Sequence, residues 1–233
     1  MSSFDDWLKS AGYAIDGILH AAKTQRHLRY HFYAAFFVLF LSFLLGVARS
    51  EFLIISVSVI LVLLAEMLNT AIEATVDLIS PERCEKARIA KDVAAGTVFV
   101  TSCGVAVVGS IILFPYAQGL FTSGFRIARH SGQDIALLAI VSVLIAVVLL
   151  KARFGGGTAL AGGMPSGHAA LAYSAWVSIT YLTGSFAASA IAFVMAFAVA
   201  RSRIKKKIHR PMEVAAGGAL GAIITFCFFR LFS

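Results

Sequence analysis

The chain has 233 residues, of which 59% are hydrophobic, and its mean hydropathy is +0.86. Soluble domains contain about 45–50% apolar residues, so this composition excludes an ordinary soluble protein and indicates an integral membrane protein. The net charge of +8 does not favour a nucleic-acid partner, because Lys and Arg in membrane proteins usually mark cytoplasmic segments and contacts with anionic lipids.

The first 31 residues are too polar for a secretory signal peptide, and they predict an amphipathic helix on the membrane surface. Seven apolar segments follow, at residues 32–48, 52–79, 92–115, 134–150, 167–182, 185–200 and 212–231. A helical span needs about 20 residues, with some latitude. The sequence therefore predicts an all-α integral membrane protein with one surface helix and about seven transmembrane helices.

The distribution of positive charge predicts the orientation. With a cytoplasmic N-terminus, 16 of the 20 Lys and Arg residues fall on the cytoplasmic side, which agrees with the positive-inside rule. The polar segment 117–133 then lies on the other side of the membrane, and we take it as the linker between a first domain, 1–116, and a second domain, 134–233. The three cysteines have neither metal-ligand spacing nor the pattern of a disulfide framework.

The second apolar segment ends in an unusual polar row, "AEMLNTAIEATVDL". Its polar residues fall within an arc of roughly 80° on a helix: Glu66, Asn69, Glu73 and Asp77. We expect Ser80 and Pro81 to end this helix and start a new one, which leads to Lys91 and Asp92. Carboxylates and a lysine at the cytoplasmic face suit Mg²⁺ with a polyphosphate, although a polar packing network or an ion path remains an alternative.

This row, together with "AKDVAAGTV" and "SAGYAIDGILHAAKTQRHLRYH", resembles the prokaryotic diacylglycerol kinase and undecaprenol kinase family over about residues 4–115. The resemblance implies a bacterial cytoplasmic membrane protein that uses Mg²⁺ and ATP, forms homotrimers and contributes three transmembrane helices here. By resemblance, Glu66 is the catalytic base and Glu73 a metal ligand. The implied ATP-binding residues are Asn69, Asp77, Lys91 and Asp92.

One residue departs from that family's pattern. Gln25 stands in "KTQRH", where the family usually has a metal-binding glutamate in the surface helix. An amide oxygen can still coordinate a metal ion, but it lacks the negative charge. The departure leaves open whether the first domain is an active kinase or a scaffold.

A second polar group lies in the last third of the chain. "GGMPSGH" places Ser166, Gly167 and His168 at a predicted helix start, which is a favourable place for an anion. Further on, "SRIKKKIHRPME" sets Glu213 one helical turn after His209, where a carboxylate can orient the imidazole. With Lys151 these residues would meet on the cytoplasmic face and form an anion-handling catalytic site.

The motifs PSGH and SR-x5-H resemble the type 2 phosphatidic acid phosphatase (PAP2) superfamily over about residues 134–231, with four transmembrane helices. By resemblance, His209 is the nucleophile, Glu213 orients it, and His168 protonates the leaving lipid oxygen. The implied phosphate-binding residues are Lys151, Arg153, Ser166, Gly167, Ser202 and Arg203, and no cofactor is implied. The first motif of that superfamily is incomplete, because Thr158 stands at its arginine position, and we consider Arg153 as the substitute.

The two resemblances predict a bifunctional enzyme that acts on membrane lipids. One domain would phosphorylate a lipid alcohol, diacylglycerol or undecaprenol, and the other would hydrolyse a lipid phosphate. Two alternatives remain at this point. In one, only the phosphatase works and the first domain is a trimerising scaffold. In the other, the chain is a transporter whose helices have polar faces.

Overall fold

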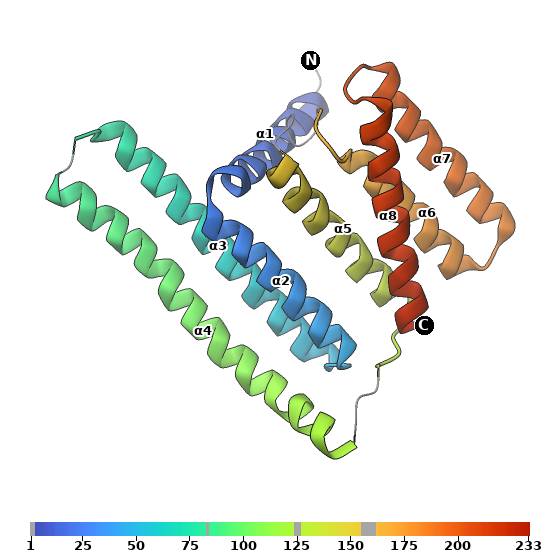
Figure 1. Cartoon of the computed structure of the whole chain (residues 1–233), viewed down its shortest axis with the longest axis horizontal. Helices are drawn as coiled ribbons and strands as arrows, with labels where there is room; N and C mark the ends of the chain where they lie inside the picture. Colours follow the sequence, from blue (N-terminus) through green and yellow to red (C-terminus); the bar gives the residue numbers. More distant parts are fainter. Residues whose placement is uncertain (1–2, 83, 124–126, 155–161) are drawn as a thin grey trace. The chain divides into compact units, whose positions relative to one another are not determined.

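The computed structural model describes residues 3–82, 84–123, 127–154 and 162–233, and all its regular elements in these ranges are helices (Figure 1). Among the described residues, six helices are long and apolar enough to cross a membrane. The seventh expected span, α6 (Gly167–Thr183), has 17 residues. The predicted all-α membrane fold is confirmed. The helices group into two compact units, residues 25–128 and residues 1–24 with 129–233.

The unit of residues 25–128 contains α2 (Arg26–Leu44), α3 (Arg49–Ile79) and α4 (Glu85–Ser123). Helix α3 packs against both α2 and α4 (Figure 1). Its 31 residues correspond to about 46 Å, well beyond the roughly 30 Å of a bilayer's hydrocarbon core. The polar end of α3 therefore has the length to emerge from the apolar layer, as the sequence predicted.

Helix α4 extends beyond the predicted apolar segment 92–115, because it continues through Pro115 to Ser123. Tyr116, the residue after the proline, connects this part of α4 to the start of α3 through hydrogen bonds. The Tyr116 hydroxyl donates to Glu51 Oε2 at 2.6 Å and accepts from the backbone amide of Ala48 at 3.0 Å. These contacts fix the position of the turn that carries the proline.

The connection between α3 and α4 also differs from the prediction. Ser80 is the C-terminal cap of α3 rather than the start of a new helix, and its hydroxyl donates to the carbonyl of Glu82 at 3.1 Å. Helix α4 begins at Glu85, and the Cys84 sulfur accepts from the backbone amide of Ala87 at 3.4 Å. The Ser80 hydroxyl and this amide lower the pKa of the exposed Cys84 thiol.

The other unit contains α1 (Ser3–Thr24), α5 (Gly132–Phe154), α6, α7 (Phe186–Lys205) and α8 (Pro211–Phe232). Helix α6 packs against α5, α7 and α8, and α1 packs against α5. Because the consecutive helices α5 to α8 alternate in direction, the end of α5, the start of α6, the end of α7 and the start of α8 share one end of the unit (Figure 1).

Two glycines of α8 permit its close approach to α6. A Cβ atom on Gly217 would lie 2.3 Å from the carbonyl oxygen of Ser166, and one on Gly221 would lie 1.9 Å from that of Ala170. Both distances are shorter than any real contact. The spacing of these glycines therefore serves packing within the chain and brings the start of α8 against the PSGH segment.

Candidate active sites

The polar row of α3 faces neighbouring helices of its own unit. Glu66 is 5% exposed, and its Oε1 lies 3.0 Å from Nε2 of His31 in α2. Three residues further along α3, the Asn69 amide donates to Glu73 Oε1 at 2.9 Å. The side-chain oxygen of Asn69, Oδ1, is buried and has no hydrogen-bond partner among the described residues. This part of the row holds two carboxylates and one unsatisfied acceptor oxygen.

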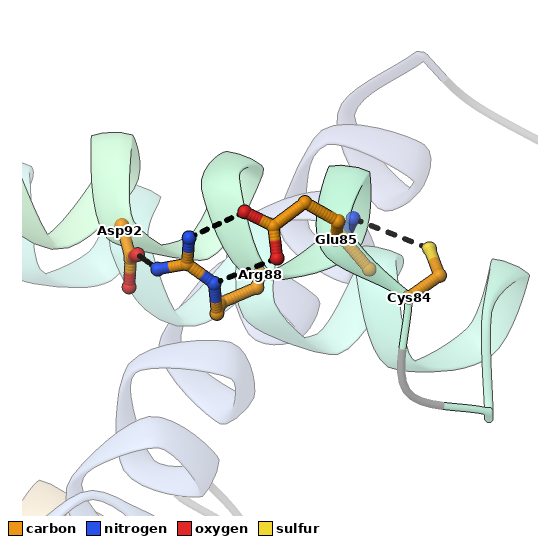
Figure 2. A network of polar contacts seen from close by, with 5 residues as sticks. Cys84, Glu85, Arg88 and Asp92 are labelled. Carbon is orange, nitrogen blue, oxygen red and sulfur yellow. Dashed lines mark hydrogen bonds and ion pairs between the residues drawn. The ribbon is translucent and has the colours of Figure 1, made fainter.

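Further along, the row is tied to α4 by charge. The Lys91 ammonium donates to Asp77 Oδ1, and this pair is partly exposed. Arg88 bridges two acids of its own helix, with 2.7 Å from its guanidinium to Asp92 and 2.6 Å to Glu85 (Figure 2). Asp92 is therefore paired with Arg88, a residue that the sequence analysis did not consider. Such exposed pairs contribute little to stability, so they can rearrange around a ligand.

The chemistry of these groups fits Mg²⁺. The unsatisfied Asn69 oxygen and the Glu73 carboxylate, joined by their hydrogen bond, offer the oxygen donors that this ion prefers. Gln25 is half-buried at the N-cap of α2, and its side chain forms no cap hydrogen bond. In the described ranges no contact joins it to Glu73, and no group of three or more His, Cys, Asp or Glu side chains is arranged around a metal position. Because Mg²⁺ shares its coordination with phosphate oxygens and water, one or two protein ligands suffice.

The other candidate site lies where α5 to α8 share one end of their unit. The His209 Nδ1 atom lies 2.7 Å from Glu213 Oε2, as the one-turn spacing predicted. The same carboxylate oxygen accepts from the Arg210 backbone amide at 3.2 Å. His209 is 5% exposed, and its Nε2 atom is buried without a hydrogen-bond partner among the described residues. One ring nitrogen is thus held while the other is available to react.

Two more unsatisfied polar atoms come from the same motifs. The Ser166 hydroxyl, at the N-cap of α6, and the Arg203 Nε atom are both buried, and neither has a hydrogen-bond partner in the part of the chain that the structure describes. The Ser166 backbone amide donates to the Glu213 carbonyl at 2.9 Å, and the His209 amide donates to the Arg203 carbonyl at 3.3 Å. Backbone hydrogen bonds therefore connect the PSGH segment, the start of α8 and the end of α7.

His168 and Lys151 complete this cluster. The charges of Arg203, His209 and Lys151 all act on His168, so the four groups are close enough to interact. Lys151 is 1% exposed and donates to the Gly162 carbonyl at 3.0 Å. Gly167 is the first residue of α6, and a Cβ there would lie 3.3 Å from Val147. Burying several cations together is costly unless an anion joins them.

Two predicted phosphate ligands make no described hydrogen bond to the residues of this cluster. Arg153 is exposed on α5, and in the described ranges no contact joins it to the histidines. The Ser202 hydroxyl likewise makes no described hydrogen bond, while the Ser202 carbonyl accepts from the Lys206 amide at 3.0 Å. Thr158 lies outside the described residues.

Charged or titratable side chains that the sequence did not assign to the sites also lie near both of them. Lys23 and Asp16 of α1 lie close enough to act electrostatically on Lys151. His31 contacts Glu66 from α2. Asp16, Lys23 and His31 all belong to the quoted segment "SAGYAIDGILHAAKTQRHLRYH". Their partners lie on other helices, and spacing within one helix does not predict such contacts.

The fold and these two clusters define a multi-pass membrane enzyme with one carboxylate-rich site and one cationic site built around two histidines. The model of the prokaryotic diacylglycerol kinase family matches residues 12–113, and that of the PAP2 superfamily matches residues 150–233. The chain belongs to the prokaryotic diacylglycerol kinase family through its first part, and its second part matches the model of the PAP2 superfamily. Both predicted resemblances are confirmed.

Relatives of the first part include two bacterial kinases. The diacylglycerol kinase of Haemophilus influenzae is 36% identical over 107 residues, which are 46% of this chain and 91% of that protein. The undecaprenol kinase of Bacillus subtilis is 38% identical over 109 residues, 47% of this chain and 89% of that protein. No solved structure gives a significant match. The chain is therefore a multi-pass bacterial membrane protein that joins a lipid kinase domain, whose family implies the use of ATP, to a lipid phosphatase domain.

Proposed function

We propose that this chain is a bifunctional lipid enzyme in the bacterial cytoplasmic membrane. Residues 1–116 would transfer phosphate from ATP to a lipid alcohol, diacylglycerol or undecaprenol, and residues 134–233 would hydrolyse a lipid phosphate. The segment 117–133 would link the two domains outside the cytoplasm. The distribution of Lys and Arg supports a cytoplasmic N-terminus, with which both sites would lie on the cytoplasmic face.

The phosphatase proposal rests above all on the buried, unpartnered Nε2 atom of His209. In the proposed reaction this nitrogen attacks the phosphorus atom, and the bond from phosphorus to the lipid oxygen breaks. Glu213, bonded to Nδ1, stabilises the positive charge that develops on the imidazole. Arg203, Lys151, the Ser166 hydroxyl and the Gly167 amide would hold the phosphate oxygens.

His168 would then supply the proton that the leaving lipid oxygen takes up. Water would then attack the phosphorus of the phosphohistidine and give one of its own protons to His168, while the bond from phosphorus to His209 Nε2 breaks and inorganic phosphate is released. The cations around His168 disfavour its protonated form, and the negative charge of a bound phosphate would offset them, so this role requires the substrate to be in place. All the groups in this sequence of steps belong to the chain itself.

In the kinase domain, Glu66 would accept the proton of the lipid hydroxyl as that oxygen attacks the terminal phosphate of ATP. Glu73, with Gln25 or the Asn69 oxygen, would hold Mg²⁺, which would neutralise charge on the phosphates. Lys91, Asp77, Asn69 and Asp92 would shape the nucleotide site. As the family resemblance implies, we propose a homotrimer for this domain, which cross-linking in native membranes would test.

One residue favours a second candidate function. Gln25 lacks the charge of the glutamate expected at its position, so a weakened kinase domain could serve as a lipid-binding scaffold for a working phosphatase. In that case the chain would release phosphate from lipids and would transfer none to them.

A single purified variant separates the two functions. His209→Ala in lipid micelles, given Mg²⁺ and γ-labelled ATP, cannot remove the label through the second site. We expect labelled lipid with diacylglycerol or undecaprenol, and none without lipid or in the double variant that adds Glu66→Gln. Phosphate release from lipid phosphates should be lost in His209→Ala and retained in Glu66→Gln. Absence of labelled lipid under all conditions would support the scaffold instead, and phosphate release that survives His209→Ala would contradict the proposed nucleophile.

A further inference from the structure

The proposed function assigns no role to the contact between His31 and Glu66. It joins α2 to α3 within one unit, with 3.0 Å between His31 Nε2 and Glu66 Oε1. The Glu66 side chain is 7% exposed and the His31 side chain is 28% exposed. An ionised carboxylate can only accept a hydrogen bond, so Nε2 is the donor.

His31 is the one hydrogen-bond or ion-pair partner of the Glu66 carboxylate in the described part of the chain. The other acids of this region have partners of their own. Glu73 accepts a hydrogen bond from Asn69, Asp77 pairs with Lys91, and Asp92 pairs with Arg88. A buried carboxylate that loses its only partner is costly and free to turn. The orientation of the Glu66 carboxylate therefore depends on His31 more than on any residue of α3.

The surroundings strengthen this contact. His31 lines an apolar cavity of about 500 Å³ between α2, α3 and α4, together with Val62, Leu63 and Ser102. Little water competes for the carboxylate in such a place, and a hydrogen bond to a charged group gains strength where the local dielectric is low. The imidazole thus lies between the buried carboxylate and an apolar space.

We propose that His31 is a positioning residue for the catalytic base of the kinase domain, an inference that rests on the proposed function of Glu66. By holding Oε1, His31 leaves Oε2 directed at the lipid hydroxyl. In the step, the O–H bond of the lipid breaks and its proton passes to Oε2. The lipid oxygen forms a bond to the terminal phosphorus of ATP, whose bond to the ADP oxygen breaks.

The experiment compares variants in the His209→Ala background, which preserves labelled product. His31→Leu should lower kcat for lipid phosphorylation by about 10- to 100-fold, the usual effect of misplacing a catalytic group by about 1 Å. The KM for ATP should change by less than about twofold, because His31 does not reach the nucleotide in this scheme. His31→Gln should recover part of kcat, since its amide nitrogen can donate to Oε1 without titrating.

The matched control is His27→Leu. His27 lies one turn earlier on α2, is exposed, and packs edge-on against Tyr30 with 6.5 Å between ring centroids. It should retain the parent's kcat and KM. Melting temperatures of His31→Leu, Glu66→Gln and the double variant should be non-additive, because the two side chains are partners in the fold.

Each outcome is decisive. Parent-like kcat in His31→Leu, with Glu66→Gln inactive, would overturn the role of His31 and leave the kinase proposal intact. Equal losses in His31→Leu and His31→Gln, accompanied by a higher KM for ATP, would show a general structural defect and also contradict positioning. If the parent itself transfers no phosphate, the kinase proposal fails and this inference fails with it, even where the melting temperatures confirm the contact.

Discussion

At the residue scale, the two candidate sites differ in how their buried polar atoms are satisfied. In the phosphatase site, His209 Nε2, the Ser166 hydroxyl and Arg203 Nε are buried without partners. Such atoms cost free energy unless a ligand satisfies them, and a phosphate oxygen can accept from the guanidinium and the hydroxyl while its phosphorus meets the nitrogen. In the candidate kinase site, by contrast, most carboxylates already have partners. The buried side-chain oxygen of Asn69 has none among the described residues.

The Gln25 side chain leads to a prediction about Mg²⁺ dependence. Gln25→Glu should lower the Mg²⁺ concentration needed for half-maximal lipid phosphorylation by about 10-fold, which corresponds to about 1.4 kcal/mol. The added charge makes a better Mg²⁺ ligand, and it lies at the start of α2, where the helix dipole favours an acid. Titrating Mg²⁺ in the His209→Ala background would measure this change.

The control for this prediction is Gln25→Leu, which removes the oxygen while keeping an uncharged side chain. It should require more Mg²⁺ than the parent. If the glutamate and leucine variants share the parent's Mg²⁺ dependence, position 25 does not bind the metal ion, and the metal ligand is elsewhere.

What the sequence predicts at this scale depends on whether partners share a helix. The His209–Glu213 contact follows from one-turn spacing, and the face shared by Glu66 and Glu73 follows from the helical period. His31 could not be assigned to Glu66, because contacts between helices depend on packing that no spacing within one helix determines. Arg153, two residues after Lys151, is exposed, so its assignment to the site stays a prediction.

At the element scale, the approach of α8 to α6 builds the phosphatase site. The Ser166 amide donates to the Glu213 carbonyl at 2.9 Å, and this bond requires the absence of a side chain at position 217. Long helices with uninterrupted apolar composition could be predicted, including α3 and α5. The continuation of α4 beyond Pro115 could not, because it involves a tyrosine that bonds to Glu51, 65 positions earlier in the chain.

The close packing of α8 leads to a prediction about Gly217. Gly217→Ala should abolish most phosphatase activity and destabilise this unit by about 1–3 kcal/mol, the usual cost of overpacking. The added methyl group would lie 2.3 Å from the Ser166 carbonyl oxygen, so the PSGH segment must move away from His209. Phosphate release and the melting temperature of the purified protein would measure both effects.

Gly104→Ala in α4 provides the comparison, because a Cβ at that position meets nothing within 4 Å. It should leave phosphate release unchanged, and alanine's higher helix propensity should leave stability equal or slightly higher. Full phosphatase activity in Gly217→Ala would show that the start of α6 tolerates displacement, which would contradict a site built on this contact.

At the scale of the whole molecule, the two proposed activities oppose each other, and together they could consume ATP without a net product. A kinase and a phosphatase that used the same lipid on the same membrane face would cycle phosphate and hydrolyse ATP without net product. Substrate specificity resolves this if each domain accepts a different lipid. Helices of both units present apolar side chains to their surroundings, including Phe99 of α4 and Met195 of α7.

We therefore predict that the two domains do not share a lipid. Wild-type protein supplied with Mg²⁺, γ-labelled ATP and the preferred lipid alcohol should accumulate labelled lipid to a plateau. Its time course should match that of His209→Ala, because the product of the first domain is not a substrate of the second. Continuous release of labelled inorganic phosphate by wild type, absent from both His209→Ala and Glu66→Gln, would reveal a shared lipid. In that case the two activities would have to be separated by regulation instead, since a constantly active pair would consume ATP for as long as any lipid alcohol remained.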